Sequence, residues 1–140
     1  MFLTPAVWCR FSQVGGEVSS LDESLRRILA VEGVRSAALI DLATGMVVRS
    51  AGAEPATLPE AAASLAGEVR AADQAQGPLR PGGDLDEIAL FTAGRLHLTK
   101  VLDRRRPGEG LLLFVDVDRT HANPALATLR IGQAAPAVLA

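Results

Sequence analysis

The stretch that decides the fold runs from Leu85 to Val117 and reads LDEIALFTAGRLHLTKVLDRRRPGEGLLLFVDV. Three short apolar runs are separated by two turns that contain glycine, the second of them spanning the charged segment 103–110. Apolar runs joined by short glycine-bearing turns are typical of consecutive β-hairpins. We therefore predict an antiparallel meander of three strands here, and we expect the other elements to flank or cover it.

The last run of the meander, Leu111–Val117, is apolar on both of its alternating faces. One face carries Leu111, Leu113, Val115 and Val117, and the other carries Leu112 and Phe114. A strand that is apolar on both faces has to be covered on both. The pattern predicts that this strand lies in the middle of the sheet.

Length and composition are those of a single globular domain. The chain has 140 residues, of which 49% are hydrophobic and 21% are charged. Fourteen basic residues against sixteen acidic ones give a net charge of −2, which argues against a nucleic-acid binder and gives no support for binding to an anionic membrane. No apolar run approaches the roughly 20 residues of a membrane-spanning helix.

Cys9 is the single cysteine of the chain, which excludes an internal disulfide framework and a cysteine-rich zinc site. A reducing, cytoplasmic location fits this usage. Residues 1–18 begin with an apolar segment that has no basic region before it and is interrupted by Pro5. We interpret them as an amino-terminal arm rather than a signal peptide, separated from the next element by Gly15 and Gly16.

Three helices are predicted from capping signals and apolar spacing. The first covers 20–32, with a capping box from Ser20 to Glu23, and the second covers 58–75, with a capping box from Thr57 to Glu60. The third starts at Asn123 and Pro124 and ends near Gly132. A hairpin, Val34–Leu42 followed by Met46–Ser50, lies between the first two helices.

The predicted order is therefore helix, strand, strand, helix, three strands, helix. Hairpins dominate, so the class is α+β with a five-stranded, mainly antiparallel sheet and helices packed on it. We place an amino-terminal arm at 1–18, one domain at 19–133 and a loose tail at 134–140.

This order, together with particular segments, resembles the Roadblock/LC7 family, whose members have a profilin-like α+β sandwich. The resemblance covers Leu21 to about Gly132. It rests on patterns of size and apolarity, with glycines at the turns, in Leu25–Ala37, Ile40–Ser50, Phe91–Leu98 and Leu111–Val117.

The resemblance implies a non-catalytic regulator or scaffold. Bacterial members of the family accompany small Ras-like GTPases and in some cases stimulate GTP hydrolysis, and a free-standing single domain suits that bacterial type. It also implies homodimers or heterodimers in which strand three of each copy pairs edge to edge and the second helices pack together. We therefore expect a homodimer whose interface contains Ile88, Ala89, Leu90 and Phe91 from the strand and Ala62, Leu65, Ala66 and Val69 from the helix.

Two physical arguments bear on this interface. An edge strand leaves unpaired amides and carbonyls that a partner strand satisfies. The small residues of helix 58–75 let another backbone come close, although alanine is also simply the best helix former.

The residue patterns of common active sites are missing from the sequence. It contains no P-loop motif, and its serines lack a nucleophile-elbow setting. His97 and His121 are too isolated for a metal site, and Asp116 and Asp118 are better explained as a strand end leading into a turn than as a cation pair. We expect no catalytic residue, cofactor or metal.

Arg104, Arg105 and Arg106 are the one run of charge, which we expect on a hairpin loop. Such arginines are candidates for contact with a partner, and a solvated loop tip is the simpler interpretation. The main hypothesis is thus a homodimeric regulator of a Ras-like GTPase. The alternative is a small-ligand-sensing or structural dimerisation module without a GTPase partner.

Overall fold

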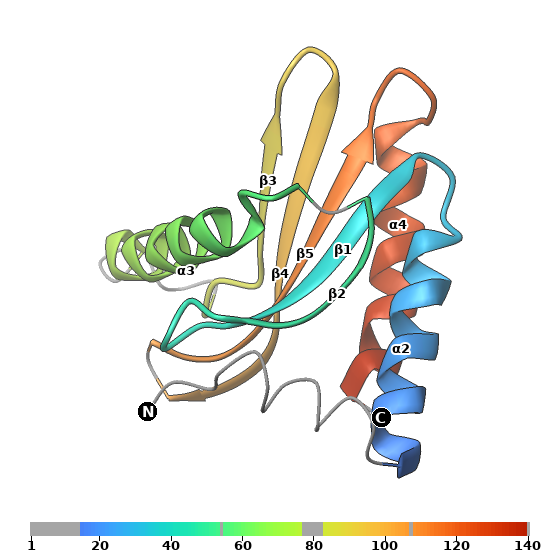
Figure 1. Cartoon of the computed structure of the whole chain (residues 1–140). Coiled ribbons are helices and arrows are strands. Elements are labelled where there is room, and N and C mark those ends of the chain that lie inside the picture. Colours follow the sequence, from blue (N-terminus) through green and yellow to red (C-terminus); the bar gives the residue numbers. More distant parts are fainter. Residues whose placement is uncertain (1–14, 54, 77–82, 107, 140) are drawn as a thin grey trace.

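The computed structural model describes residues 15–53, 55–76, 83–106 and 108–139. Its elements follow the predicted order of helices and strands (Figure 1), with a final 3-10 helix added. They are α2 (Gly15–Leu29), β1 (Val34–Asp41), β2 (Val47–Gly52), α3 (Leu58–Ala75), β3 (Glu87–Phe91), β4 (Arg95–Arg106), β5 (Glu109–Asp118), α4 (Pro124–Ala134) and η2 (Ala135–Leu139). Residues 1–14 of the predicted arm lie outside the described residues.

The five strands form one sheet in the order β2-β1-β5-β4-β3, and every pairing in it is antiparallel. β5 occupies the centre, as its two apolar faces predict. β3 lies at one edge, beside β4 alone. The predicted meander is confirmed, and its first strand is the one that forms an end of the sheet.

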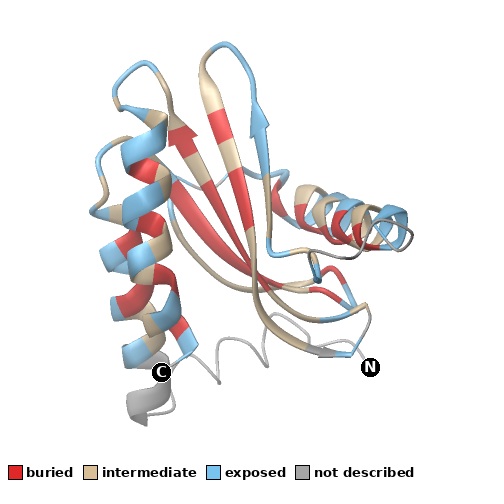
Figure 2. Ribbon diagram, turned by 180° about the vertical axis from the view of Figure 1, so that it is seen from behind, coloured by how far each residue is buried: buried red, intermediate tan, exposed pale blue. Residues whose placement is uncertain are grey.

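Both faces of the sheet are covered, and each has its own apolar cluster. α2 and α4 lie side by side along one face while α3 lies on the other (Figure 1). On the first face Leu113, Val115 and Val117 of β5 pack against α2, α4 and η2. On the second face Leu112 and Phe114 pack against α3. The alternation along β5 thus supplies side chains to two layers of core, and Figure 2 shows buried segments along the central strands and on the helices.

The two predicted capping boxes are wrong in detail, whereas the predicted third cap is confirmed. α2 begins at Gly15, so Ser20 lies inside the helix; no proline or glycine between Gly16 and Ser20 interrupts it. α3 has the predicted bounds, but the Thr57 side chain makes no capping hydrogen bond. Asn123 caps α4: its side-chain oxygen accepts hydrogen bonds from the amides of Ala125 at 2.9 Å and Leu126 at 3.3 Å.

The expectation of a loose tail is wrong for Ala135–Leu139. These residues form η2, and Ala135 and Val138 are buried in the cluster under α2 and α4. The Ser24 hydroxyl donates a hydrogen bond to the Ala137 carbonyl at 3.1 Å, which ties η2 to α2. The apolar side chains of η2 pack against α2. This burial orders a segment whose sequence shows no helical spacing of apolar residues.

The expectation of a long charged loop at 103–110 is also wrong. β4 continues to Arg106 and β5 starts at Glu109, so the hairpin turn is short and the arginines lie on a strand. Two irregularities in register, between Val101 and Asp103 and between Arg104 and Arg106, break the alternation of side chains. Because bulges remove the period of two, the sequence pattern there does not read as a strand.

The central strand provides a test of this core. Replacing Leu113, which is 0% exposed, by alanine (Leu113→Ala) should lower the free energy of unfolding by about 2–5 kcal/mol through lost burial and a cavity. Urea denaturation at fixed protein concentration measures this. The matched control is Leu129→Ala at a leucine that is 58% exposed, with an expected change of at most about 0.5 kcal/mol. Equal losses in the two variants would contradict the assignment of β5 to the core.

Candidate functional site

The outward side of β3 is an open sheet edge, here called the β3 edge. The Thr92 amide donates to the Arg95 carbonyl at 3.0 Å, and the Val101 amide donates to the Asp86 carbonyl at 2.8 Å. Hydrogen-bonded and non-hydrogen-bonded pairs alternate along antiparallel strands. The backbone groups of residues 88 and 90 therefore point toward β4, and those of residues 87, 89 and 91 point outward. Within the described ranges no strand pairs with that outward side.

The side chains of β3 are unusually apolar for an exposed strand. Leu90 is 45% exposed and Phe91 is 56% exposed, Ala89 is exposed, and Ile88 is half-buried. Figure 2 shows this strand as mostly exposed at the border of the sheet. An edge that offers both free backbone groups and apolar side chains is a template for another strand. The β3 edge is therefore the candidate functional site.

The two faces of the β3 edge differ in their surroundings. Ile88 packs against the cluster under α3, so Leu90, two residues on, faces the same side. Ala89 and Phe91 face the α2 and α4 side, opposite Leu98 and Leu96 of β4. A partner strand would thus extend both apolar layers of the sandwich at once.

Three of the four helix residues predicted for the interface are buried inside the protomer. Ala62 and Ala66 are 0% exposed and Val69 is 1% exposed, because α3 turns this stripe toward its own sheet. Small side chains there let the helix lie close to the strands, so these residues serve the core of the protomer and offer no side-chain surface to a partner. Of the four predicted helix residues, Leu65 alone is half-buried and keeps some surface.

The predicted arginine run is split by the structure. Arg104 donates to Asp73 of α3 at 2.8 Å and to the Leu85 carbonyl at 2.8 Å, so its side chain is used inside the protomer. It ties α3 to the segment that leads into β3. This role excludes Arg104 as a free contact. Arg106 is exposed, and the side chain of Arg105 lies outside the described residues.

Sequence reasoning missed the ion pair between Asp73 and Arg104, although a signal for it was present. Asp73 follows Val69 by one helical turn on the stripe that α3 buries, and it is 7% exposed. A carboxylate at a core position of a helix requires a buried partner. That requirement points to a cation from the sheet beneath, and Arg104 is the one that the fold supplies.

A second set of contacts shapes the end of the β3 edge. The Arg119 guanidinium lies 5.0 Å from the centre of the Phe91 ring and donates to the Thr92 carbonyl at 2.6 Å. A cation over an aromatic face is attracted by the ring quadrupole. The Arg119 amide also donates to the Gly94 carbonyl at 2.9 Å. The turn between β3 and β4 is thereby fastened to the end of β5.

The acidic residues at the end of β5 serve turns and ion pairs. Arg95 donates to Asp116 at 2.8 Å, and the His97 Nε2 atom lies 3.4 Å from the same carboxylate. Asp118 accepts hydrogen bonds from the Thr120 hydroxyl at 2.6 Å and the Thr120 amide at 2.9 Å, and the His121 Nδ1 atom lies 2.8 Å from it. These hydrogen bonds, that of the Thr120 hydroxyl first, hold the pKa of the Asp118 carboxyl well below its usual range.

The described residues contain no group of three or more His, Cys, Asp or Glu side chains that would hold a metal ion. Among the helices that the structure describes, none is both long and apolar enough to cross a membrane.

The element order and the antiparallel five-stranded sheet with its helices are those of the Roadblock/LC7 fold. A Roadblock/LC7 domain from Streptomyces avermitilis has this fold at a TM-score of 0.63 and 19% identity, over 85% of this chain and 98% of that one. The gliding protein MglB from Thermus thermophilus is similar at a TM-score of 0.74 and 26% identity, over 89% of this chain and 90% of that one.

A further MglB structure, described as having a tetrameric arrangement, is similar at a TM-score of 0.74 and 26% identity over 89% of each chain. No family model matches the sequence, and no curated protein matches it either. The similarity to known proteins is thus carried by the three-dimensional structure.

The ion pair between Arg104 and Asp73 leads to a second prediction. Arg104→Met should lower the free energy of unfolding by about 2 kcal/mol, because the buried Asp73 carboxylate loses its arginine partner. Urea denaturation measures the loss. Arg106→Met, two residues along the same strand at an exposed position, is the control and should change stability by at most about 0.5 kcal/mol. If both variants were as stable as the parent chain, the ion pair would have no structural role.

Proposed function

We propose that this chain is a cytoplasmic, non-catalytic homodimer that binds a small Ras-like GTPase and regulates its hydrolysis of GTP. The observation that carries the proposal is the β3 edge: on its outward side β3 pairs with no described strand, and it carries exposed Leu90 and Phe91 on a Roadblock/LC7 fold. An open apolar edge of this kind invites aggregation unless it is covered, so a specific partner strand is the simplest solution.

In the proposed dimer the two β3 strands run antiparallel about a two-fold axis at Ala89. The outward backbone groups of residue 87 in one copy then face those of residue 91 in the other, and the Ala89 residues face each other. On the α3 side Ile88 of each copy lies opposite Leu90 of the other, which makes one self-complementary apolar patch. The two five-stranded sheets join into one continuous sheet.

The α3 helices of the two copies then approach each other over the joined sheet. Leu65 is the helix residue that we place at this contact, since it keeps surface and packs in the same cluster as Ile88. Ala62, Ala66 and Val69 support the contact indirectly by holding α3 on its own sheet.

The backbone geometry of β3 allows a selective test of the dimer. Ala89→Pro removes an amide that points outward, so it should leave the bonds to β4 intact while blocking the partner strand. Leu90→Arg should act in a second way, since a charge buried without a partner costs several kcal/mol. Both variants should sediment as monomers at concentrations where the parent chain is a dimer.

Leu129→Arg is the matched control for the dimer test, because it changes an exposed leucine on α4, away from β3. This variant should stay dimeric. A parent chain that is itself monomeric at micromolar concentration, or variants at the β3 edge that keep the dimer mass, would contradict the proposed interface.

A GTPase partner is supported by the bacterial Roadblock/LC7 proteins that the sequence resembles and by the similarity to the gliding protein MglB. The sequence has no P-loop of its own, so the nucleotide would be bound by the partner. The chain would act by positioning the residues of the GTPase. The inward use of Arg104 fits this mode better than a catalytic arginine donated by the regulator.

Pull-down and GTP-hydrolysis assays with purified small GTPases test this part. We expect the chain to bind one of them in its GTP-loaded form and to change the rate of phosphate release at least several-fold, whereas the chain alone hydrolyses no GTP. The Ala89→Pro variant should lose the effect if the dimer is the active form. A dimer that binds no GTPase would be a structural dimerisation module instead.

A further inference from the structure

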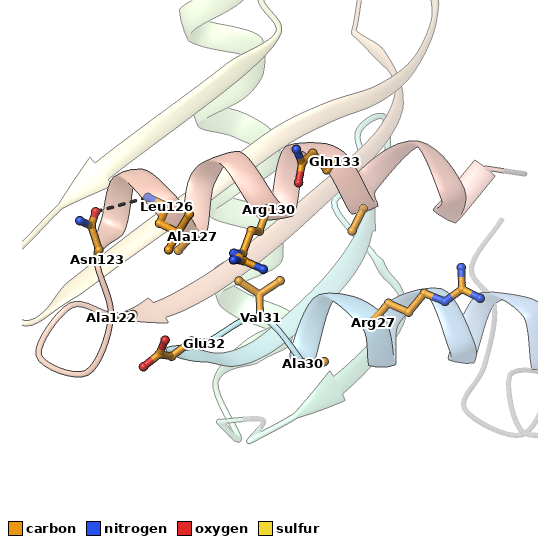
Figure 3. A pocket seen from close by; sticks show the side chains of 11 residues that line it. Arg27, Ala30, Val31, Glu32, Ala122, Asn123, Leu126, Ala127, Arg130 and Gln133 are labelled. Atoms are coloured by element: carbon orange, nitrogen blue, oxygen red, sulfur yellow. Dashed lines mark hydrogen bonds between the residues drawn. The ribbon is translucent and has the colours of Figure 1, made fainter.

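A groove runs between α2 and α4 on the side of these helices that faces solvent (Figure 3). Its volume is about 580 Å³, and it is lined by residues from the end of α2, the turn after it, the loop before α4 and one side of α4. We call it the α2–α4 groove. None of its lining residues belongs to β3, so its role is separate from that of the β3 edge.

The floor of the α2–α4 groove is apolar and partly uncovered. Ala30 and Val31 come from the turn that follows α2, and Leu126, Ala127 and Ala134 come from α4. Leu126 is 44% exposed even though it lines the groove, and Leu129, one turn further along α4, is 58% exposed. Large apolar side chains left open in and beside a groove are typical of a surface that receives another protein.

The rim of the α2–α4 groove is basic, in a chain that is acidic overall. Arg27 and Arg130 are both exposed, and neither guanidinium group makes an ion pair or hydrogen bond with a residue that the structure describes. Glu32 is the one acidic residue that lines the groove, while the whole chain carries a net charge of −2. In Figure 3 Arg130 points from α4 toward Val31, and Arg27 lies away from the Glu32 end.

We propose that the α2–α4 groove binds an amphipathic segment of a partner protein that carries carboxylates. Apolar side chains of the segment would lie over Val31 and Leu126, and its carboxylates would bind Arg27 and Arg130. Guanidinium groups prefer carboxylates because two parallel hydrogen bonds form at once.

The charge of the rim favours an acidic segment over two other possible occupants, a basic segment and a second copy of this chain. A basic segment would meet the two arginines with like charge, and such a juxtaposition disfavours binding. A second copy of this chain, docked groove to groove about a two-fold axis, would bring the arginines of one copy near those of the other. Of these three occupants, an acidic amphipathic segment is the one that satisfies both the apolar floor and the two arginines of the rim.

The test uses the full chain, labelled with ¹⁵N, and two short helical peptides. One peptide has leucines on one face and glutamates on the other, and its twin has lysines in place of the glutamates. Nuclear magnetic resonance should show shifts in the backbone amides of residues 27–34 and 122–134 with the glutamate peptide, and much smaller shifts with the lysine peptide. The affinity should fall as salt is raised, since exposed ion pairs are screened.

Two charge-reversal variants complete the design. Arg130→Glu should lower the affinity for the glutamate peptide at least several-fold and raise the affinity for the lysine peptide. Arg106→Glu reverses the same charge at an exposed position on β4, outside the groove. It should change the affinity for neither peptide. The dispersion of the amide spectrum shows whether each variant is folded, and Arg27→Glu serves in place of Arg130→Glu if that variant is not.

Several results would overturn the proposal. These are the absence of shifts with the glutamate peptide, equal shifts with both peptides, shifts confined to residues 87–91, and groove shifts that depend on protein concentration without any peptide. The last would assign the groove to a second copy. The Leu90→Arg variant should still bind the glutamate peptide, so failure here is distinguishable from failure of the proposed dimer.

Discussion

The fold depends on one constraint, which is that β5 must be buried on both of its faces. Its residues alternate between two apolar sets, so neither face of the strand can be left to water. α2, α4 and η2 cover one face, and α3 covers the other. The helices therefore lie over the two faces of the central strand. The strands at the edges of the sheet are less well covered. β3 is exposed because it stands two strands away from β5.

Two different kinds of surface result from this arrangement. The β3 edge is a backbone surface, whose free amides and carbonyls fit any strand of matching length, with selectivity added by Leu90 and Phe91. The α2–α4 groove is a side-chain surface, whose selectivity lies in Arg27 and Arg130. They lie on different elements, so contacts at one leave the other accessible. Such a division suits a protein that works by bringing other proteins together.

The sequence predicted the element order, the central strand and the bounds of α3, because apolar periodicity and glycine turns act locally. It did not predict what depends on contacts between distant segments. The packing of η2 needs α2 beside it, and the strand character of 104–106 is hidden by bulges that break the alternation. The helix stripe of Ala62, Ala66 and Val69 was correctly seen as one face, but periodicity does not say which neighbour that face meets. The β3 edge stays a prediction as an interface.

The alternation of backbone groups along β3 has a consequence for the substitutions that the strand tolerates. Amides at residues 88 and 90 are committed to the sheet, and a change that disturbs them is felt by the folded chain. Amides at residues 87, 89 and 91 carry no such burden, and the side chain of Ala89 fills little of the core. Alternate residues of the same short strand therefore use their backbone groups for folding and leave them available for assembly. A change that acts through the backbone amide, such as a substitution by proline, is therefore tolerated by the folded chain at the odd positions and resisted at the even ones.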